Sequence, residues 1–142
     1  MNLEKLRNQL IEFEGIRFRP YRCTAGKLTI GVGRNLDDVG ISVEEAYFLL
    51  DNDIKAVVAS LNKYPFFTAL EGDDVRQRVL VDMAFNLGVR GLLEFRQTLA
   101  AVEAKDFGLA ARLMLASKWA GQVGRRARIL SEMLRSGLDK TK

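Results

Sequence analysis

The sequence predicts an α+β fold that is mainly α, with a small β-hairpin lobe, a long linking helix and a larger all-helical lobe. Three observations predict it. Apolar residues recur at helical spacing over most of the 142 residues. One segment near the N-terminus suits short strands around a turn. A capping box then begins a helix of roughly 20 residues, about 30 Å long, enough to link two lobes.

The N-terminal elements come first in this scheme. Residues 2–13 form an amphipathic helix face, with apolar positions at steps of three and four: Leu3, Leu6, Leu10 and Phe13. Residues 18–23 and 27–33 suit two strands, with residues 24–26 as the turn between them. Pro20 lacks an N–H group, so we expect the first strand to lie at the edge of its sheet.

The rest of the chain predicts helices. Ser42 and Glu45 are spaced as a capping box, and the helix that follows should reach about Asn62, before the stop signal of Lys63-Tyr64-Pro65. The later helices are expected from Asp73 or Asp74 to Gly88, and over 95–104, 107–117 and 124–135. We expect one domain over 1–142, with 13–60 as small lobe and linking helix, and 1–12 and 61–142 as the helical lobe.

Composition excludes several kinds of chemistry. The chain has no histidine, which excludes Ser–His–Asp and Cys–His catalysis and zinc sites built on histidine. Its single cysteine excludes an internal disulfide and a cysteine-only metal site. The net charge of +4 favours polyanions such as nucleic acid or bacterial envelope polymers, although a mild positive excess is also common in soluble proteins. No secretory signal or membrane span is predicted, so we expect a soluble protein made in the cytoplasm.

Carboxylates are the remaining candidates for acid–base work. Hydrolysis of a glycosidic bond commonly uses two of them across a cleft. Glu14 lies where the first helix meets the hairpin, which suits a proton donor. Asp37 or Asp38 could be the second carboxylate, but "NLDDVG" is equally good turn chemistry. The residues alone leave this choice open.

Three segments resemble the phage-type lysozymes, the endolysin family. "EGIRFRPYRCTAGKLTIGVGRN" (14–35) matches their catalytic pattern of Glu, eight residues, Asp or Cys, five residues and Thr. "VLVDMAFNLG" (79–88) is similar to the central helix of their large lobe, and "SKWAGQVGRRARI" (117–129) to their Ser-Arg-Trp segment and basic helix. The segment between Arg34 and Ser42 is shorter than in the larger members, which puts the details of the subsites on that side in question.

The resemblance implies hydrolysis of the β-1,4 bond between N-acetylmuramic acid and N-acetylglucosamine in peptidoglycan, without metal or organic cofactor. Glu14 would be the general acid. Cys23 stands where many relatives carry Asp, and would hold the attacking water together with Thr29. A thiolate attack would give a thioglycoside that turns over poorly, so we favour inversion, with a separation of roughly 6.5–9.5 Å between acid and partner. A covalent retaining route stays open.

The same resemblance implies supporting residues. Arg126 is expected beside Glu14 as its charge partner, and Arg34 is expected to pair with Asp53. Substrate contacts are expected from Asn35, Phe85, Asn86 and Thr98. Phe85 could instead belong to the core, and we interpret Trp119 as a residue that packs in the core.

The implied biology is that of a phage or prophage endolysin. It would be a monomer made in the host cytoplasm, acting on the wall after a separate holin-type protein perforates the membrane, with no membrane insertion and no nucleic-acid partner. An inactive peptidoglycan-binding module on the same fold is the alternative. A basic helical nucleic-acid binder is favoured only by charge.

Overall fold

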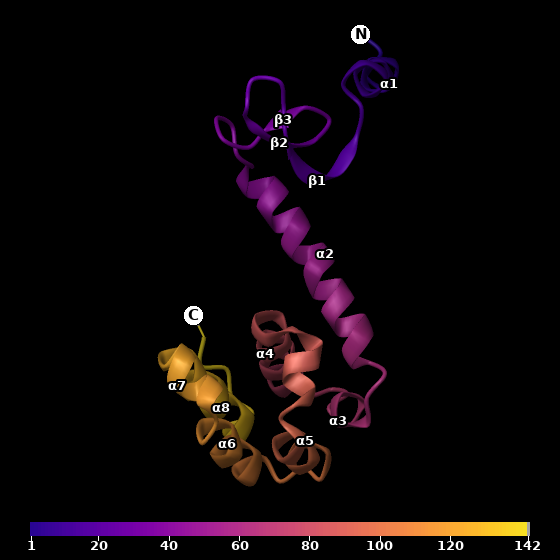
Figure 1. Cartoon of the computed structure of the whole chain (residues 1–142). Helices are drawn as coiled ribbons and strands as arrows, with labels where there is room; N and C mark the ends of the chain where they lie inside the picture. The colour runs from indigo at the N-terminus through magenta and orange to yellow at the C-terminus, as the bar shows by residue number, and fades with distance from the viewer. Residues whose placement is uncertain (142) are drawn as a thin grey trace. The chain divides into compact units, whose positions relative to one another are not determined.

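The computed structural model describes residues 1–141, and it confirms the mainly helical α+β fold. Figure 1 shows a three-stranded sheet in the N-terminal part and a cluster of helices in the C-terminal part. The chain divides into one unit from Met1 to Leu49, here called the hairpin unit, and a second from Leu50 onward, here called the helical unit. The long helix α2 (Val43–Leu61) spans the boundary between them. The expected grouping of residues 1–12 with the helical lobe stays a prediction.

The hairpin unit begins with α1 (Leu3–Glu14), whose first turn is capped by the Asn2 side chain accepting from the Lys5 N–H at 2.9 Å. The sheet follows in the order β1 (Arg17–Arg22), β2 (Leu28–Gly31) and β3 (Arg34–Asn35), with both pairs antiparallel. Strand β1 is an edge strand, as Pro20 predicts. Strand β3 was not predicted, because two residues are too few to show an alternating pattern.

The capping box at the start of α2 forms as predicted. The Glu45 N–H donates to Ser42 Oγ at 3.1 Å, and the Ser42 N–H donates to Glu45 Oε1 at 3.0 Å. The same Glu45 oxygen accepts from Arg34 Nη1 at 2.8 Å, and this nitrogen also donates to the Gly40 carbonyl at 3.1 Å. The capping box turns the Glu45 carboxylate back toward the segment that carries Arg34.

Arg34 therefore has a partner that the resemblance does not imply, and its expected pair with Asp53 stays a prediction. Asp53 makes no ion pair with residues 1–141, whereas Glu45 is paired with Arg34. Asp53 lies eight residues after Glu45, about 12 Å further along a helix. The resemblance implies Asp53 at this position, whereas sequence spacing alone does not show which carboxylate lies nearer to Arg34.

The Arg34–Glu45 pair predicts a pH-dependent stability. The pKa of Glu45 is lowered to about 2. The largest cause is its hydrogen bond with the Arg34 guanidinium, and the hydrogen bonds from Ser42 contribute less. The unfolded value is higher, near 4.3, so the stabilisation is present above that pH and is lost as the pH falls toward 2. At pH 7 we expect Glu45→Gln to unfold at a lower temperature than the unsubstituted protein. This difference should shrink below pH 4.5. The effect is small because the two side chains are 38% and 42% exposed, so solvent screens the pair. A difference that does not change with pH would contradict this role for the charge.

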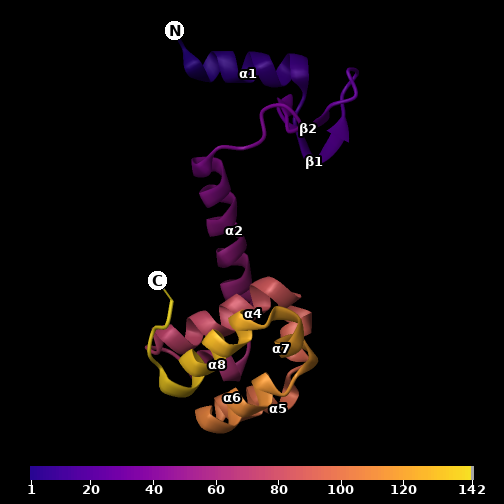
Figure 2. The ribbon, with the colours of Figure 1, turned by 90° about the vertical axis from the view of Figure 1, so that its left-hand side faces the viewer.

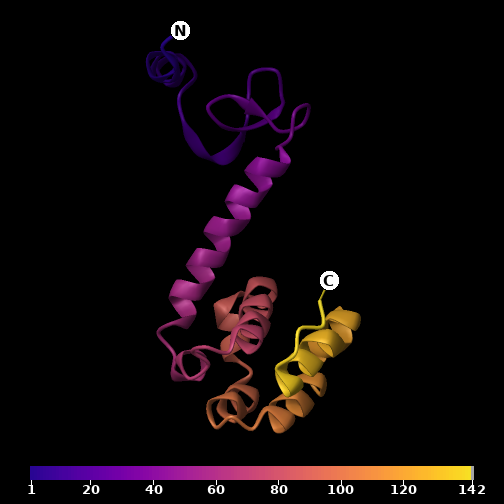
Figure 3. The ribbon, with the colours of Figure 1, turned by 180° about the vertical axis from the view of Figure 1, so that it is seen from behind.

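The helical unit contains the end of α2 and six further helices within the described residues. These are α3 (Pro65–Thr68), α4 (Asp74–Leu93), α5 (Arg96–Glu103), α6 (Phe107–Leu115), α7 (Lys118–Val123) and α8 (Arg125–Ser136). Figures 2 and 3 show α4, α5, α6, α7 and α8 gathered around a common centre. Pro65 follows the end of α2, as the stop signal predicts, and it also begins α3, because its fixed φ suits a first helical position.

Gly88 marks a real break, as predicted. Its backbone has φ 77° and ψ 156° inside α4, which leaves the helical conformation before the helix resumes.

The buried core is built from side chains of α2 through α8, including Leu61, Leu80, Met83, Met114 and Leu134. None of the helices described between residues 1 and 141 has both the length and the apolar character of a membrane span.

The Arg76 side chain of α4 contacts both α8 and α6. Its Nε donates to the Leu134 carbonyl at 2.7 Å, and its Nη2 donates to the Arg135 carbonyl at 3.0 Å. Its guanidinium carbon lies 3.7 Å from the centre of the Phe107 ring. The side chain thus satisfies carbonyl groups at the end of α8 that the helix itself cannot satisfy.

Candidate active site

Glu14 is the last residue of α1 and its side chain is exposed. Gly15 follows with φ 74°, so the chain leaves the helix immediately and enters the sheet. The Glu14 carboxylate lies over the backbone of Gly33, in the turn that joins β2 to β3. The predicted acid is therefore held between the end of a helix and the sheet of the same unit.

Cys23 and Thr29 lie side by side on the hairpin. Cys23 directly follows β1, is half-buried, and its N–H donates to the Lys27 carbonyl at 3.0 Å. Thr29 is paired with Tyr21 across the β1–β2 ladder and is 3% exposed. Its hydroxyl donates to the Lys27 carbonyl at 2.8 Å. The sulfur is accordingly neither sealed in the core nor fully in solvent.

The surroundings of Cys23 favour its thiolate. The backbone N–H groups of Lys27 and Ala25 lower the pKa of the Cys23 thiol, partial desolvation opposes them, and the Thr29 hydroxyl adds to the lowering. Thr29 has one hydroxyl proton, which it can give either to the Lys27 carbonyl or to the thiolate. A thiolate that borders a hydroxyl can accept a proton from a water molecule held between them.

Asp37 and Asp38 prove to be turn residues. Asp37 Oδ2 accepts from the Leu28 N–H at 2.8 Å and lies 3.5 Å from Arg22 Nη1. Asp38 Oδ1 lies 3.2 Å from Lys27 Nζ. Both carboxylates thus fix the loop after β3 to the start of β2. These contacts are the turn chemistry that the sequence offers as one of the two alternatives for these residues.

Asn35 takes part in the same turn. Its Nδ2 donates to Asp38 Oδ2 at 3.0 Å, and its Oδ1 accepts from the Asp38 N–H at 2.9 Å. The amide is engaged locally, and its predicted contact with substrate stays a prediction.

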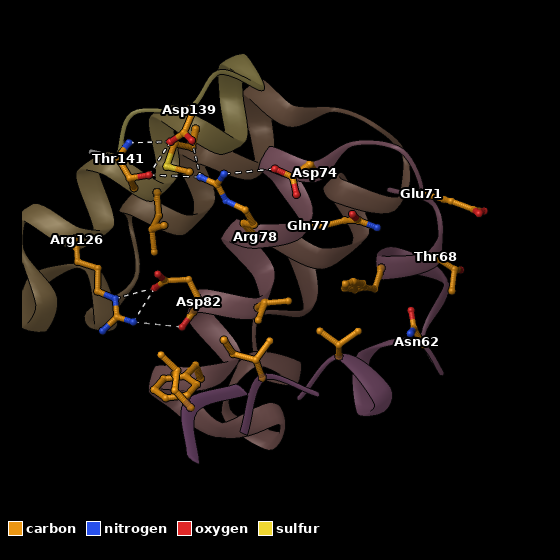
Figure 4. A pocket seen from close by; sticks show the side chains of 18 residues that line it. Asn62, Thr68, Glu71, Asp74, Gln77, Arg78, Asp82, Arg126, Asp139 and Thr141 are labelled. Atoms are coloured by element: carbon orange, nitrogen blue, oxygen red, sulfur yellow. Dashed lines mark hydrogen bonds and ion pairs between the residues drawn. The ribbon is translucent and has the colours of Figure 1, made fainter. Parts of the chain in front are cut away.

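The helical unit carries a groove of about 1200 Å³ (Figure 4). Its apolar lining includes Phe85, which is 46% exposed, together with Ile54, Val81, Leu130 and Met133. Phe85 is therefore a surface residue of a groove and not part of the buried core.

Two ion-pair clusters line the same groove (Figure 4). Arg126 Nε donates to Asp82 Oδ1 at 2.7 Å, and Arg126 Nη2 lies at 2.7 Å from the same oxygen. Arg78 contacts Asp139 at 2.9 Å and Asp74 at 3.3 Å. Arg126 thus has an acidic partner inside the helical unit, which the sequence comparison did not predict.

Asn86 and Thr98 differ in their suitability for substrate contact. Asn86 is exposed, and its Oδ1 accepts from Trp119 Nε1 at 2.8 Å. Trp119 is 4% exposed and packs edge-on against Phe95, as its interpretation as a packing residue requires. Thr98 is 3% exposed, although it borders a smaller cavity of about 420 Å³. A direct sugar contact by Thr98 is less well supported than one by Asn86.

Three residues of the site region were missed by sequence reasoning. Gly33 lies in the turn between β2 and β3, and its sequence context gives no signal of the contact with Glu14. Asp82 is a single acidic residue within an apolar helical run, which is a signal for a basic partner on another element. Glu45 was seen only as part of the capping box. In each case the contact joins segments that are distant in sequence.

A carboxylate at a helix end and a thiol and a hydroxyl on the neighbouring hairpin thus lie within one unit of a mainly helical chain with a small sheet. The family model for phage lysozyme matches residues 11–134. The chain belongs to the phage lysozyme family, and it is a glycoside hydrolase of the lysozyme type that acts on peptidoglycan.

Two curated relatives agree with this assignment. A SAR-endolysin of Escherichia phage Mu is 32% identical, over 87% of this chain and 75% of the relative. A probable T4-type lysozyme 1 of Dictyostelium discoideum is 23% identical, over 95% of this chain and 96% of the relative.

Proposed function

We propose that this enzyme hydrolyses the β-1,4 bond between N-acetylmuramic acid and N-acetylglucosamine with inversion. Glu14 is the general acid, and Cys23 and Thr29 hold the attacking water. The observation that carries the proposal is the juxtaposition of the Cys23 thiol and the Thr29 hydroxyl on the hairpin, in surroundings that lower the pKa of the thiol. Glu14 is exposed in the same unit and free to meet a substrate.

The reaction balances without a covalent intermediate. Glu14 gives its proton to the glycosidic oxygen as the bond from that oxygen to the anomeric carbon breaks. The water oxygen bonds to the anomeric carbon, and one water proton passes to the Cys23 thiolate. Protons then return from Cys23 to Glu14 through solvent, which restores both groups. No metal or organic cofactor takes part in these steps.

Three residues are the proposed substrate contacts. Asn35 in the hairpin unit and Phe85 and Asn86 in the helical unit are the candidates. The exposure of Phe85 on a groove and the exposed amide of Asn86 support this assignment. Thr98 remains a predicted contact with weaker support because of its burial.

Arg126 remains the proposed charge partner of Glu14. The Arg126–Asp82 interaction uses Nε and Nη2 of the guanidinium, and within residues 1–141 no hydrogen bond of Nη1 is found. Asp82 would then orient Arg126 and offset part of its charge.

The proposed setting is that of a phage or prophage endolysin acting as a monomer. The protein would be made in the host cytoplasm and would reach its peptidoglycan substrate after a separate holin-type protein perforates the membrane. The presence of a SAR-endolysin and a T4-type lysozyme among the relatives supports a lytic role.

Analysis of the products tests the proposal. We expect digestion of purified peptidoglycan to release fragments with N-acetylmuramic acid at the reducing end, identified by mass spectrometry after borohydride reduction. NMR of the fresh product should show the α anomer first, because inversion of a β bond gives α. Reducing ends of N-acetylglucosamine would contradict the proposed bond. The β anomer appearing first would contradict single-step attack by water and indicate a covalent intermediate. Binding without any soluble product would indicate the inactive module.

A further inference from the structure

Gly33 lies directly against the carboxylate of Glu14. A Cβ atom on Gly33 would lie 3.3 Å from Glu14 Oε2, 3.6 Å from its Cδ and 3.8 Å from its Cγ. Three atoms of the acid therefore lie within 4 Å of the place that a Cβ atom would occupy on this residue of the β2–β3 turn. The contact lies entirely within the hairpin unit.

Gly31 provides a natural comparison. The backbone φ is 65° at Gly33 and 67° at Gly31, so any side chain would suffer similar strain at either position. A Cβ atom on Gly31 would have no atom within 4 Å outside its immediate neighbours. The two positions thus share the demand for a left-handed backbone, but only Gly33 contacts the acid.

We propose that Gly33 is a positioning residue for Glu14: its bare Cα atom is the surface on which the carboxylate rests and which sets the direction of its proton. This inference rests on the proposed role of Glu14 as the general acid. It extends that role, because it names what holds the acid in place once α1 has ended.

The physical argument concerns small displacements. A contact at 3.3 Å is tight, so the neighbour must give by a few tenths of an ångström. The far end of a glutamate side chain can move by this amount without unfolding the protein. A proton donor is less tolerant, because a misplacement of about 1 Å in an active site can cost about 100-fold in rate. We therefore expect about a tenfold loss in kcat from a methyl group at position 33.

The matched pair Gly33→Ala and Gly31→Ala tests the proposal on purified peptidoglycan. Both variants should lose similar thermal stability. Gly33→Ala should lose about tenfold in kcat relative to Gly31→Ala, with KM changed by no more than about twofold. Equal kcat values in the two variants would overturn the proposal. If the alanine variants do not fold, Gly33→Asn and Gly31→Asn replace them, because asparagine tolerates the left-handed backbone better.

A shorter acid at position 14 distinguishes two effects of a methyl group at position 33: displacement of the carboxylate and obstruction of the sugar. Glu14→Asp withdraws the carboxylate by one methylene from position 33. In that background Gly33→Ala should cost about twofold or less in kcat. A loss as large as in the Glu14 background, or a loss carried by KM, would mean that the methyl group obstructs the substrate, and would overturn the proposal.

A readout without substrate completes the test. In protein labelled with ¹³C at the glutamate carboxyl carbons, the Glu14 signal is the one missing from Glu14→Gln. This signal should shift in Gly33→Ala and stay in place in Gly31→Ala, and an unchanged signal in both overturns the contact itself. A shifted signal in a protein whose Glu14→Gln variant keeps full activity would instead refute the acid role, and with it the positioning role.

Discussion

Glu14→Gln is expected to lower the rate of peptidoglycan hydrolysis by about 10²–10⁴-fold, the usual contribution of a general acid. Glutamine keeps the size and hydrogen-bonding capacity of the side chain but has no proton to give to the leaving oxygen. The loss should appear in kcat, because the substituted group acts in the transition state.

The fold should survive this substitution. Glu14 is exposed at the end of α1, and within residues 1–141 no ion pair of its carboxylate is found. Circular dichroism and thermal unfolding should match those of the unsubstituted enzyme, while turbidity of a cell-wall suspension stays nearly constant. Normal lysis by the Glu14→Gln enzyme would remove Glu14 as the acid. Glu12→Gln is the control, since Glu12 is an exposed carboxylate on the same helix.

Substitution of Cys23 is expected to have the second large effect. Cys23→Ala removes the group that accepts the water proton and should cost about 10²–10³-fold in kcat. Cys23→Asp keeps an acceptor, which the family pattern also allows at this position, and should stay active. The two variants together separate a loss of chemistry from a loss of packing.

The activity of enzymes with Cys or Asp at position 23 should depend on pH in different ways. The acceptor must be deprotonated, so activity should rise as the pH passes through the pKa of that group. The hairpin lowers the pKa of the Cys23 thiol, but aspartate has an ordinary value near 3.9, well below that of a thiol. The acidic limb of the rate profile should therefore lie at lower pH in Cys23→Asp. Unaltered lysis by Cys23→Ala, or a limb at the same pH in both active enzymes, would mean that the sulfur is only structural.

The sequence by itself determined the elements of this protein whose causes are local. The spacing of Leu3, Leu6 and Leu10 specifies α1, and Ser42 with Glu45 specifies the start of α2. Pro20 confines β1 to the edge of the sheet because it has no N–H group to donate. Family resemblance then supplied the candidate acid and thiol, which composition alone left undecided.

Only the tertiary structure decided the partners of the charged and polar side chains. Arg34 pairs with Glu45, Arg126 with Asp82, and Trp119 with Asn86, and each pair joins residues at least eleven positions apart in the chain. The burial of Thr98 and the contact between Gly33 and Glu14 also belong to this group. Helical and strand patterns come from neighbours along the chain, whereas the choice among several possible charge partners depends on distances that no sequence spacing specifies.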